Sequence, residues 1–155
     1  KRVEQKSTPI KAFATLLQAL PSTRFVSIQY GNVAETVQRW QRRGYDVIHD
    51  QTIDPLKDMD GWLHQVAACD AVLTVANTTV HGAGGLNKPT MCLLSRFSDW
   101  RWLEDESVQR SYWYQSVGIA RETVPQGWQT GLRQARTWLE NGTPMPVGPR
   151  FIDTP

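Results

Sequence analysis

Two short, continuously apolar runs, at residues 71–75 and 90–94, constrain the fold of this chain more than any other feature of its sequence. A strand that is apolar at nearly every position is typical of a parallel sheet, because helices cover both of its faces. Shorter strand-like runs lie at 25–28, 45–48 and 117–120. The last of these is expected to be an edge strand.

Five helices are predicted from apolar residues that recur three and four positions apart. They lie at about 10–20, 33–43, 61–69, 78–86 and 128–139. Residues 7–9, Ser-Thr-Pro, are expected to cap the first helix, and Gly44 is expected to end the second as a C-cap glycine. Helices alternating with strands predict right-handed βαβ units. The expected fold is therefore α/β, a Rossmann-like three-layer domain with a mostly parallel sheet.

The length of 155 residues favours one domain, predicted at 1–142, followed by an extended, proline-rich tail at 143–155. A net charge of +2 is too balanced to predict a nucleic-acid partner. No apolar run approaches the roughly 18 residues of a membrane span, and no signal peptide is visible at the N-terminus. The chain lacks a starting Met, so it is treated as a possible piece of a longer protein.

The two cysteines, Cys69 and Cys92, are far apart in apolar surroundings. We interpret them as buried, reduced thiols rather than a disulfide or a metal site, which favours a cytoplasmic location. The basic cluster at 39–43 is interpreted as a solvated helix face.

The main candidate site follows the apolar run at 71–75. In an open parallel sheet, ligands bind outside the carboxyl ends of the strands. Asn77, Thr78 and Thr79 begin a predicted helix there, and the free N–H groups of a helix start favour an anion. The two threonine hydroxyls would add hydrogen bonds to a phosphate. The alternative is that Asn77 or Thr78 is an ordinary N-cap.

His81 lies three residues into that helix, beside the same position. It is either a donor to a phosphate or leaving group, or a packed and hydrogen-bonded core residue. His49 and His64 form no ligand pair with it, so no metal is predicted.

Three glycines, Gly82, Gly84 and Gly85, stand inside the same helix. They fit neither a P-loop nor a dinucleotide fingerprint. Each costs about 1 kcal/mol relative to Ala, which predicts a close approach of the helix backbone to the sheet or to a ligand.

The loop at 95–114 is unusually aromatic. Its Trp and Tyr side chains, with Arg101 and Asp99 interleaved, suit sugar stacking or a domain interface. The alternative is a loop that folds back over the end of the sheet. The aspartates between 50 and 60 form no recognisable catalytic pair, and helix capping by Asp58 or Asp60 explains them.

Residues 68–94, ACDAVLTVANTTVHGAGGLNKPTMCLL, resemble the nucleotide-binding signature of GT-B glycosyltransferases. In that signature a strand precedes Asp/Asn-Thr-x-x-x-His-Leu-Ala-Gly-Ala-Leu-Gly-Lys-Pro, and a second strand follows. The likeness is greatest to bacterial tetratricopeptide-repeat glycosyltransferases related to O-GlcNAc transferase, and to heptosyltransferases. The Asp-Trp-Arg-Trp at 99–102 and the Trp-Tyr at 113–114 resemble the bacterial repeat proteins, and 26–31 resembles a family strand that ends in Gln.

The resemblance implies the C-terminal half of such an enzyme, which holds a nucleoside-diphosphate sugar and transfers the sugar without a metal or other cofactor. The implied catalytic residue is His81. The implied substrate-binding residues are Gln29, Asn77, Thr78, Thr79, Gly82, Asp99 and Trp100, with Thr78, Thr79 and His81 facing the diphosphate and Gln29 near the nucleoside. An acceptor protein, lipid or glycan would be bound through an N-terminal half that this chain does not include, and the family's first strand is also missing.

Several positions depart from the family pattern. Gly82, Gly85 and Asn87 replace the family's Leu, Ala and Gly, and Asn32 stands near the place of a diphosphate-binding Lys. These departures keep an alternative open, a non-catalytic nucleotide-binding or protein-interaction module derived from the same fold. The base, the sugar and the acceptor are not specified by the sequence.

Overall fold

The computed structural model describes residues 10–96, 98–102, 108–124 and 127–146. The predicted cap at 7–9 and the tail residues 147–155 lie outside these ranges. The elements run in the order α2 (Ile10–Ala19), β1 (Phe25–Val26), α3 (Ala34–Gln41), β2 (Val47–Ile48), α4 (Met59–Ala68), β3 (Val72–Val75), α5 (Thr78–Gly85), β4 (Thr90–Leu94), the 3-10 helix η1 (Trp100–Trp102), β5 (Val117–Arg121) and α6 (Gln129–Glu140). The chain thus has the predicted α/β, Rossmann-like fold.

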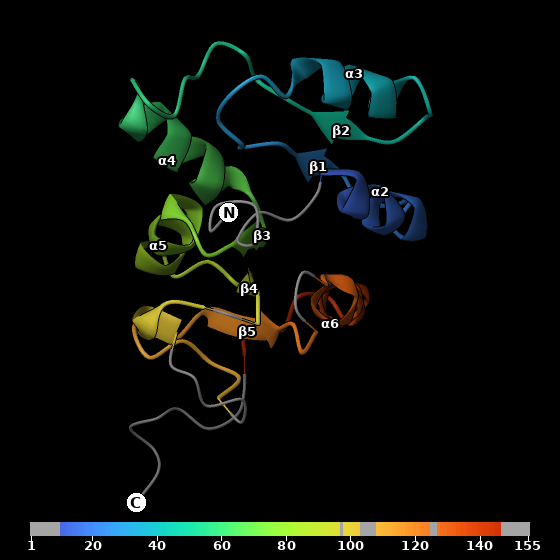
Figure 1. The fold of residues 1–155 in the computed structure, drawn as a ribbon. Helices are drawn as coiled ribbons and strands as arrows, with labels where there is room; N and C mark the ends of the chain where they lie inside the picture. Colours follow the sequence, from blue (N-terminus) through green and yellow to red (C-terminus); the bar gives the residue numbers. More distant parts are fainter. Residues whose placement is uncertain (1–9, 97, 103–107, 125–126, 147–155) are drawn as a thin grey trace, which may run out of the picture.

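All strand pairs within the sheets are parallel, but the strands form two small sheets rather than one. β1 pairs with β2, and β3, β4 and β5 form the second sheet in that order. Figure 1 shows the strands following one another as β2, β1, β3, β4 and β5. Among the described residues, no ladder of hydrogen bonds joins β1 to β3. The mostly parallel arrangement is confirmed, and the division into two sheets is a feature that the sequence pattern does not predict.

Helices cover both sides of the strands. Figure 1 shows α2 and α6 on one side, and α4 and α5 on the other. Leu16 of α2 lies in one buried cluster with Leu93 of β4 and Leu132 of α6. On the opposite side, Trp62 of α4 packs with Ala83 of α5. Burying a leucine of this kind contributes about 1.5–3 kcal/mol, so these two layers hold the second sheet in place. In the described part of the chain, no helix is long and apolar enough to cross a membrane.

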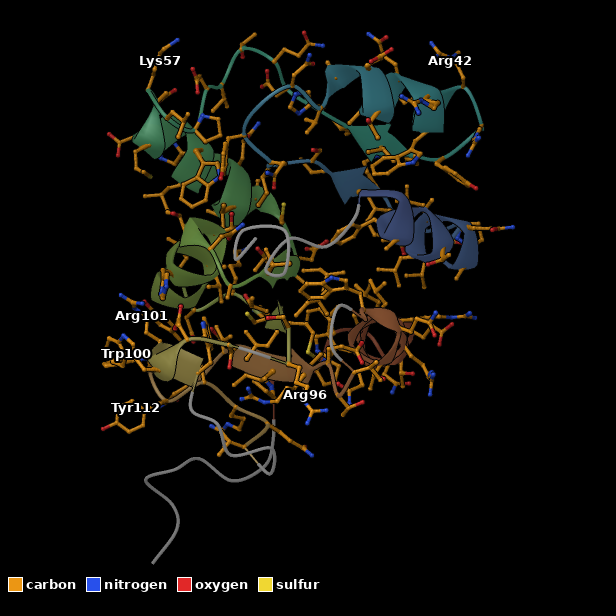
Figure 2. All side chains as sticks on the ribbon, in the orientation of Figure 1. Arg42, Lys57, Arg96, Trp100, Arg101 and Tyr112 are labelled. Carbon is orange, nitrogen blue, oxygen red and sulfur yellow. The ribbon has the colours of Figure 1, made fainter. Side chains whose placement is uncertain are left out.

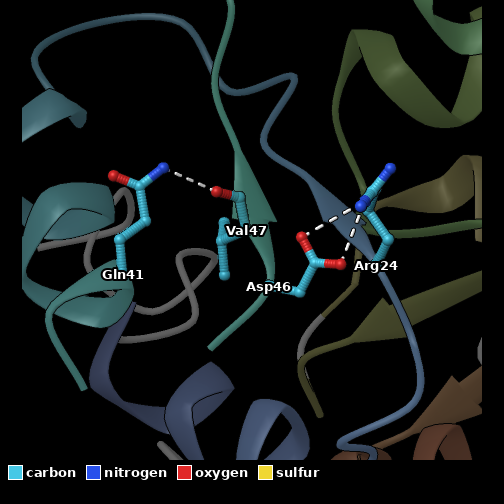
Figure 3. Close-up of polar contacts among 4 residues, drawn as sticks. All are labelled: Arg24, Gln41, Asp46 and Val47. Carbon is cyan, nitrogen blue, oxygen red and sulfur yellow. Dashed lines mark hydrogen bonds and ion pairs between the residues drawn. The ribbon is translucent and has the colours of Figure 1, made fainter. Parts of the chain in front are cut away.

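The β1–β2 sheet is small and is held largely by its own neighbours. Its ladder spans two residue pairs and is extended by a hydrogen bond from Ser27 N to Ile48 O of 2.8 Å. Figure 3 shows Arg24 Nε donating to both carboxylate oxygens of Asp46, at 3.2 and 3.0 Å. It also shows the Gln41 amide of α3 donating to Val47 O at 2.7 Å. Side chains therefore supplement a short backbone ladder.

The strand β5 is the last in its sheet, as predicted, but its outer edge is not bare. Arg110 and Gly118 form an isolated antiparallel bridge. Ser111 N donates to Val117 O at 2.8 Å, and Ile119 N donates to Gln109 O at 2.9 Å. Buried backbone groups need partners, and the end of the aromatic loop supplies them here. Part of the predicted loop thus acts as a short extra strand.

The helix ends lie within two residues of the predicted positions. Gly44 has a φ of +84°, the left-handed conformation, but α3 ends at Gln41 with Arg42 as its C-cap, so Gly44 lies in the turn beyond the cap rather than at the predicted C-cap position. The α4 helix begins two residues earlier than predicted, at Met59, because Asp58 accepts a hydrogen bond from Gly61 N at 2.8 Å and caps it. The capping interpretation of Asp58 is therefore confirmed.

Candidate functional site

The candidate site lies where the order of the strands reverses. In Figure 1 the chain runs from β1 outward to β2, then returns past β1 to β3 and continues the other way through β4 and β5. In doubly wound folds, ligands bind outside the carboxyl ends of the strands at this reversal. Gln29 follows β1 and Asn77 follows β3. The residues Ala76, Leu93, Leu94, Ser95, Ser98 and Asp99 line a small niche beside the ends of β3 and β4.

The start of α5 has an ordinary N-cap. The Asn77 side chain accepts a hydrogen bond from Thr79 N at 2.9 Å and another from Thr74 Oγ1 at 3.1 Å. The first of these bonds already satisfies one N–H at the start of the helix. Thr78 is exposed and Thr79 is half-buried. The groups that remain to bind an anion are therefore the other N–H groups of the first helical turn and the two threonine hydroxyls.

The His81 ring is half-buried and lies between two aromatic side chains of the 95–114 loop. Its Nδ1 atom lies 3.2 Å from the Tyr114 hydroxyl. The Trp102 ring stacks against it, with a centroid distance of 6.1 Å and an interplanar angle of 28°. Tyr114 meets it edge-on at 5.8 Å. The histidine is thus both hydrogen-bonded and packed, while it stands on the helix that carries Thr78 and Thr79.

Two of the three glycines of α5 do have a group close to the helix backbone, but it is a side chain of α4 or of the aromatic loop rather than the predicted sheet or ligand. A Cβ at Gly82 would lie 2.7 Å from the Trp62 ring, and one at Gly84 would overlap the Tyr114 ring. A Cβ at Gly85 would meet nothing within 4 Å. The structure accounts for Gly82 by packing against α4, although the sequence interpretation placed this residue in the binding site. Nothing in the structure explains Gly85.

The aromatic loop divides into a buried anchor and an exposed cluster. Trp102 is buried, with 2% of its surface exposed, whereas Trp100 is 68% exposed. Trp113 lies between Trp100 and Tyr112 and meets both edge-on. Figure 2 shows Trp100, Arg101 and Tyr112 gathered at one edge of the molecule. The loop thus covers the outer edge of β5 and also presents aromatic rings to solvent, and its use for sugar stacking or as a domain interface stays a prediction.

Polar contacts hold this loop against the second sheet. Asp99 accepts a hydrogen bond from Arg101 N at 3.1 Å and lies 3.6 Å from the Arg101 guanidinium. Arg121, at the end of β5, donates to Ser98 Oγ and to Trp102 O, both at 2.8 Å. Asp99 therefore has a structural role at the start of η1, in addition to its place in the niche beside β3.

Glu122 is a buried charged residue that the sequence interpretation missed. It is 2% exposed, and its carboxylate accepts hydrogen bonds from the N–H groups of Thr123, Val124 and Thr130. Burial pushes the pKa of Glu122 up, but these backbone donors outweigh it, and the pKa is lowered overall. The carboxylate thus satisfies one N–H at the start of α6, that of Thr130, and two N–H groups of the segment after β5. An acidic residue directly after a strand and shortly before a helix is the signal that identifies this role.

The remaining candidate groups have local roles. Asp50 accepts from Thr52, and Asp54 accepts from Leu56 N, and these bonds lower the pKa of both aspartates. Burial raises the pKa of the Cys92 thiol, which is fully buried, and that of Cys69, which is only partly so. Within residues 10–146, in the parts that the structure describes, no group of three His, Cys, Asp or Glu side chains forms a metal site.

The chain matches no family model, no curated protein and no solved structure. What can be said of its site therefore rests on its own residues.

The structure brings some of the predicted site residues together and leaves others apart. Thr78, Thr79 and His81 share α5, and Asp99 lies in the niche with Ala76, next to Asn77. Trp100 is joined to this group through η1 and Trp102. Gln29 is exposed after β1, and no hydrogen bond between described residues ties it to α5. The sequence interpretation did not include Tyr114 among the site residues. The only sequence signal for it was Gly84, a glycine inside a helix, which indicates that another group packs against the backbone there.

Proposed function

We propose that this chain is the donor-binding half of a glycosyltransferase that uses a nucleoside-diphosphate sugar without a bound metal. The observation that carries the proposal is the start of α5, which follows β3 directly at the strand-order reversal and presents Thr78, Thr79 and His81. A helix start at this place in an α/β fold favours a phosphate group. The resemblance of residues 68–94 to the GT-B signature suggests that this phosphate belongs to a nucleoside-diphosphate sugar.

In the proposed reaction, the main role of this chain is to stabilise the leaving group. The acceptor oxygen bonds to the anomeric carbon while the bond from that carbon to the diphosphate oxygen breaks, and the nucleoside diphosphate departs with the electron pair of that bond. The proton of the acceptor hydroxyl passes to a base of the acceptor-binding half or to water. Negative charge then grows on the diphosphate. The positive end of α5, the hydroxyls of Thr78 and Thr79, and an N–H of His81 would each stabilise that charge. These groups take the part that a metal ion plays in other transferases, and Gln29 would contact the nucleoside.

Calorimetric titration of the chain with UDP, ADP, GDP and CDP, each with and without EDTA, tests this proposal. We expect selective binding of one diphosphate that EDTA does not change. Thr79→Ala is expected to weaken that binding by about 1–2 kcal/mol, the contribution of a hydrogen bond to a charged group. Thr137→Ala, an exposed threonine on α6, is the matched control and should leave the affinity unchanged. No binding at millimolar ligand by the folded chain would contradict the proposal.

A second candidate is a non-catalytic module derived from the same fold. The packing of Trp62 against Gly82 and of Tyr114 against Gly84 favours it, since both glycines are explained without a ligand. A transfer assay on the whole protein separates the two candidates. The enzyme proposal expects His81→Ala to lower transfer more than it lowers stability. Equal transfer by the variant and the wild type would mean that His81 has a packing role and no role in transfer.

A further inference from the structure

The Tyr114 ring packs against α5 at Gly84, where the missing side chain leaves room for it. A Cβ at position 84 would overlap the Tyr114 ring, so a larger residue there would displace the ring. His81 stands three positions before Gly84, which places it on the same face of the helix. The Tyr114 hydroxyl accordingly lies 3.2 Å from Nδ1 of His81.

The backbone that carries Tyr114 is fixed to the second sheet. Ser111 Oγ accepts hydrogen bonds from Trp113 N at 3.1 Å and from Tyr114 N at 3.3 Å. Ser111 is itself 1% exposed, and its N–H donates to Val117 O of β5. Trp102 stacks on the histidine and is buried as well. The imidazole ring is therefore held by side chains whose own positions are determined by β5 and by the hydrophobic core.

A neutral imidazole has one N–H and one acceptor nitrogen, and its hydrogen bonds decide which is which. A hydroxyl that donates to Nδ1 leaves the proton on Nε2. We infer that the Tyr114 hydroxyl donates to Nδ1, rather than accepting from an Nδ1–H, and that Tyr114 is thereby a positioning residue that holds His81 as an Nε2–H donor. No other described residue hydrogen-bonds this ring, so Nε2–H is the group that is left for an anion. The role that we assign to the Nε2–H group rests on the proposed function, in which the anion is the leaving diphosphate.

The nitrogen resonances of the His81 ring test the inference directly. In 15N-labelled chain at about pH 8.5, above the usual histidine range, we expect Nε2 to be protonated and Nδ1 to show the resonance of a hydrogen-bonded acceptor. In Tyr114→Phe, which keeps the ring over Gly84, the Nδ1 resonance should move toward that of a free acceptor. Tyr112→Phe, at an exposed tyrosine nearby, should leave it unchanged. A protonated Nδ1 in the wild type, or no movement in Tyr114→Phe, would overturn the inference.

A binding cycle then separates positioning from direct contact. For the diphosphate that binds best, we expect Tyr114→Phe to raise Kd about three- to tenfold, the equivalent of one hydrogen bond. In the His81→Ala background the same change should have less than a twofold effect, because Tyr114 acts through the histidine. An equal effect in both backgrounds would mean that Tyr114 touches the ligand itself and would overturn the positioning role. If the wild type binds no diphosphate, the proposed function fails, while the nitrogen resonances still decide the state of His81.

Discussion

The β3–β4–β5 sheet and the β1–β2 sheet are built from the same kind of parallel βαβ unit, but they differ in how they are stabilised. β3 and β4 pair over four residues, and β4 and β5 over five, whereas β1 and β2 pair over two. Four of the five residues in β5 are buried, while Val26 and Ile48 of the smaller sheet are 38% and 41% exposed. The larger sheet has helices on both sides, and its outer edge is paired with residues 109–111.

The candidate site therefore takes residues from both a densely packed region and a more exposed one. Thr78, Thr79 and His81 belong to α5, which packs on the larger sheet. Gln29 belongs to the loop after the smaller sheet. Regions with few buried apolar contacts open more easily than densely packed ones. We therefore expect the phosphate-binding side of the site to be preorganised and the nucleoside side to be less so.

The largest expected effect comes from the core of the larger sheet. Leu93 is fully buried on β4, and Leu93→Ala should lower the free energy of unfolding by about 2–5 kcal/mol, as large-to-small changes in a core do. Ile48→Ala, in the smaller sheet, should cost less than about 1 kcal/mol, because its side chain is half exposed. Urea unfolding followed by circular dichroism measures both. Equal losses would contradict the difference between the sheets.

The packing of the aromatic loop on α5 gives the next effect. Gly84→Ala should lower the free energy of unfolding by about 1–3 kcal/mol, since the new Cβ would collide with the Tyr114 ring. This loss would appear although Ala favours a helix over Gly by about 1 kcal/mol. Gly85→Ala is the control, because a Cβ there meets nothing, and it should stabilise the chain by up to about 1 kcal/mol. Stabilisation by both variants would show that Tyr114 does not pack on the helix.

Glu122 gives the larger sheet a dependence on pH. Its pKa in the folded chain is lowered from the usual value of about 4.5, so the ionised carboxylate stabilises the fold above that pH. This contribution is lost as the pH falls through the lowered pKa. Glu122→Gln should cost about 2 kcal/mol at pH 7, the strength of hydrogen bonds to a charged group, and the gap to the wild type should shrink toward pH 3. Urea unfolding across this range measures the gap, and one that stays constant would exclude the carboxylate as the cause.

The smallest effect is expected at the surface of the smaller sheet. The ion pair between Arg24 and Asp46 joins side chains that are 67% and 46% exposed. Arg24→Ala should therefore cost no more than about 1 kcal/mol, and added salt should reduce that cost further. Thermal unfolding at low and high salt is the measurement. A loss of 2 kcal/mol or more would mean that this pair supports the smaller sheet as strongly as packing supports the larger one.

The sequence predicts the elements well where one physical signal dominates. The apolar run at 90–94 corresponds to β4 residue for residue, and Asp58 caps α4 as predicted. The division of the sheet was not predictable from such local patterns, because pairing between β1 and β3 depends on how distant segments meet. The strand-like run at 25–28 was accordingly longer than the two residues that form β1.

The candidate site was predictable only in part, for a related reason. The helix start at Asn77 can be recognised from three neighbouring residues. The partners of His81 cannot, because Trp102 and Tyr114 are 21 and 33 positions away along the chain. A glycine inside a helix indicates that another group packs closely against the backbone, but it does not identify that group. For Gly82 the group is the Trp62 ring rather than a ligand.

The central claim is that a diphosphate binds at the start of α5, where the two sheets meet. Backbone amide resonances of the labelled chain, followed during titration with the diphosphate that binds best, test it most directly. The account predicts that the largest shifts fall on residues 78–81, with smaller shifts at Gln29. Shifts that are confined to other parts of the chain, or none at millimolar ligand, would contradict it.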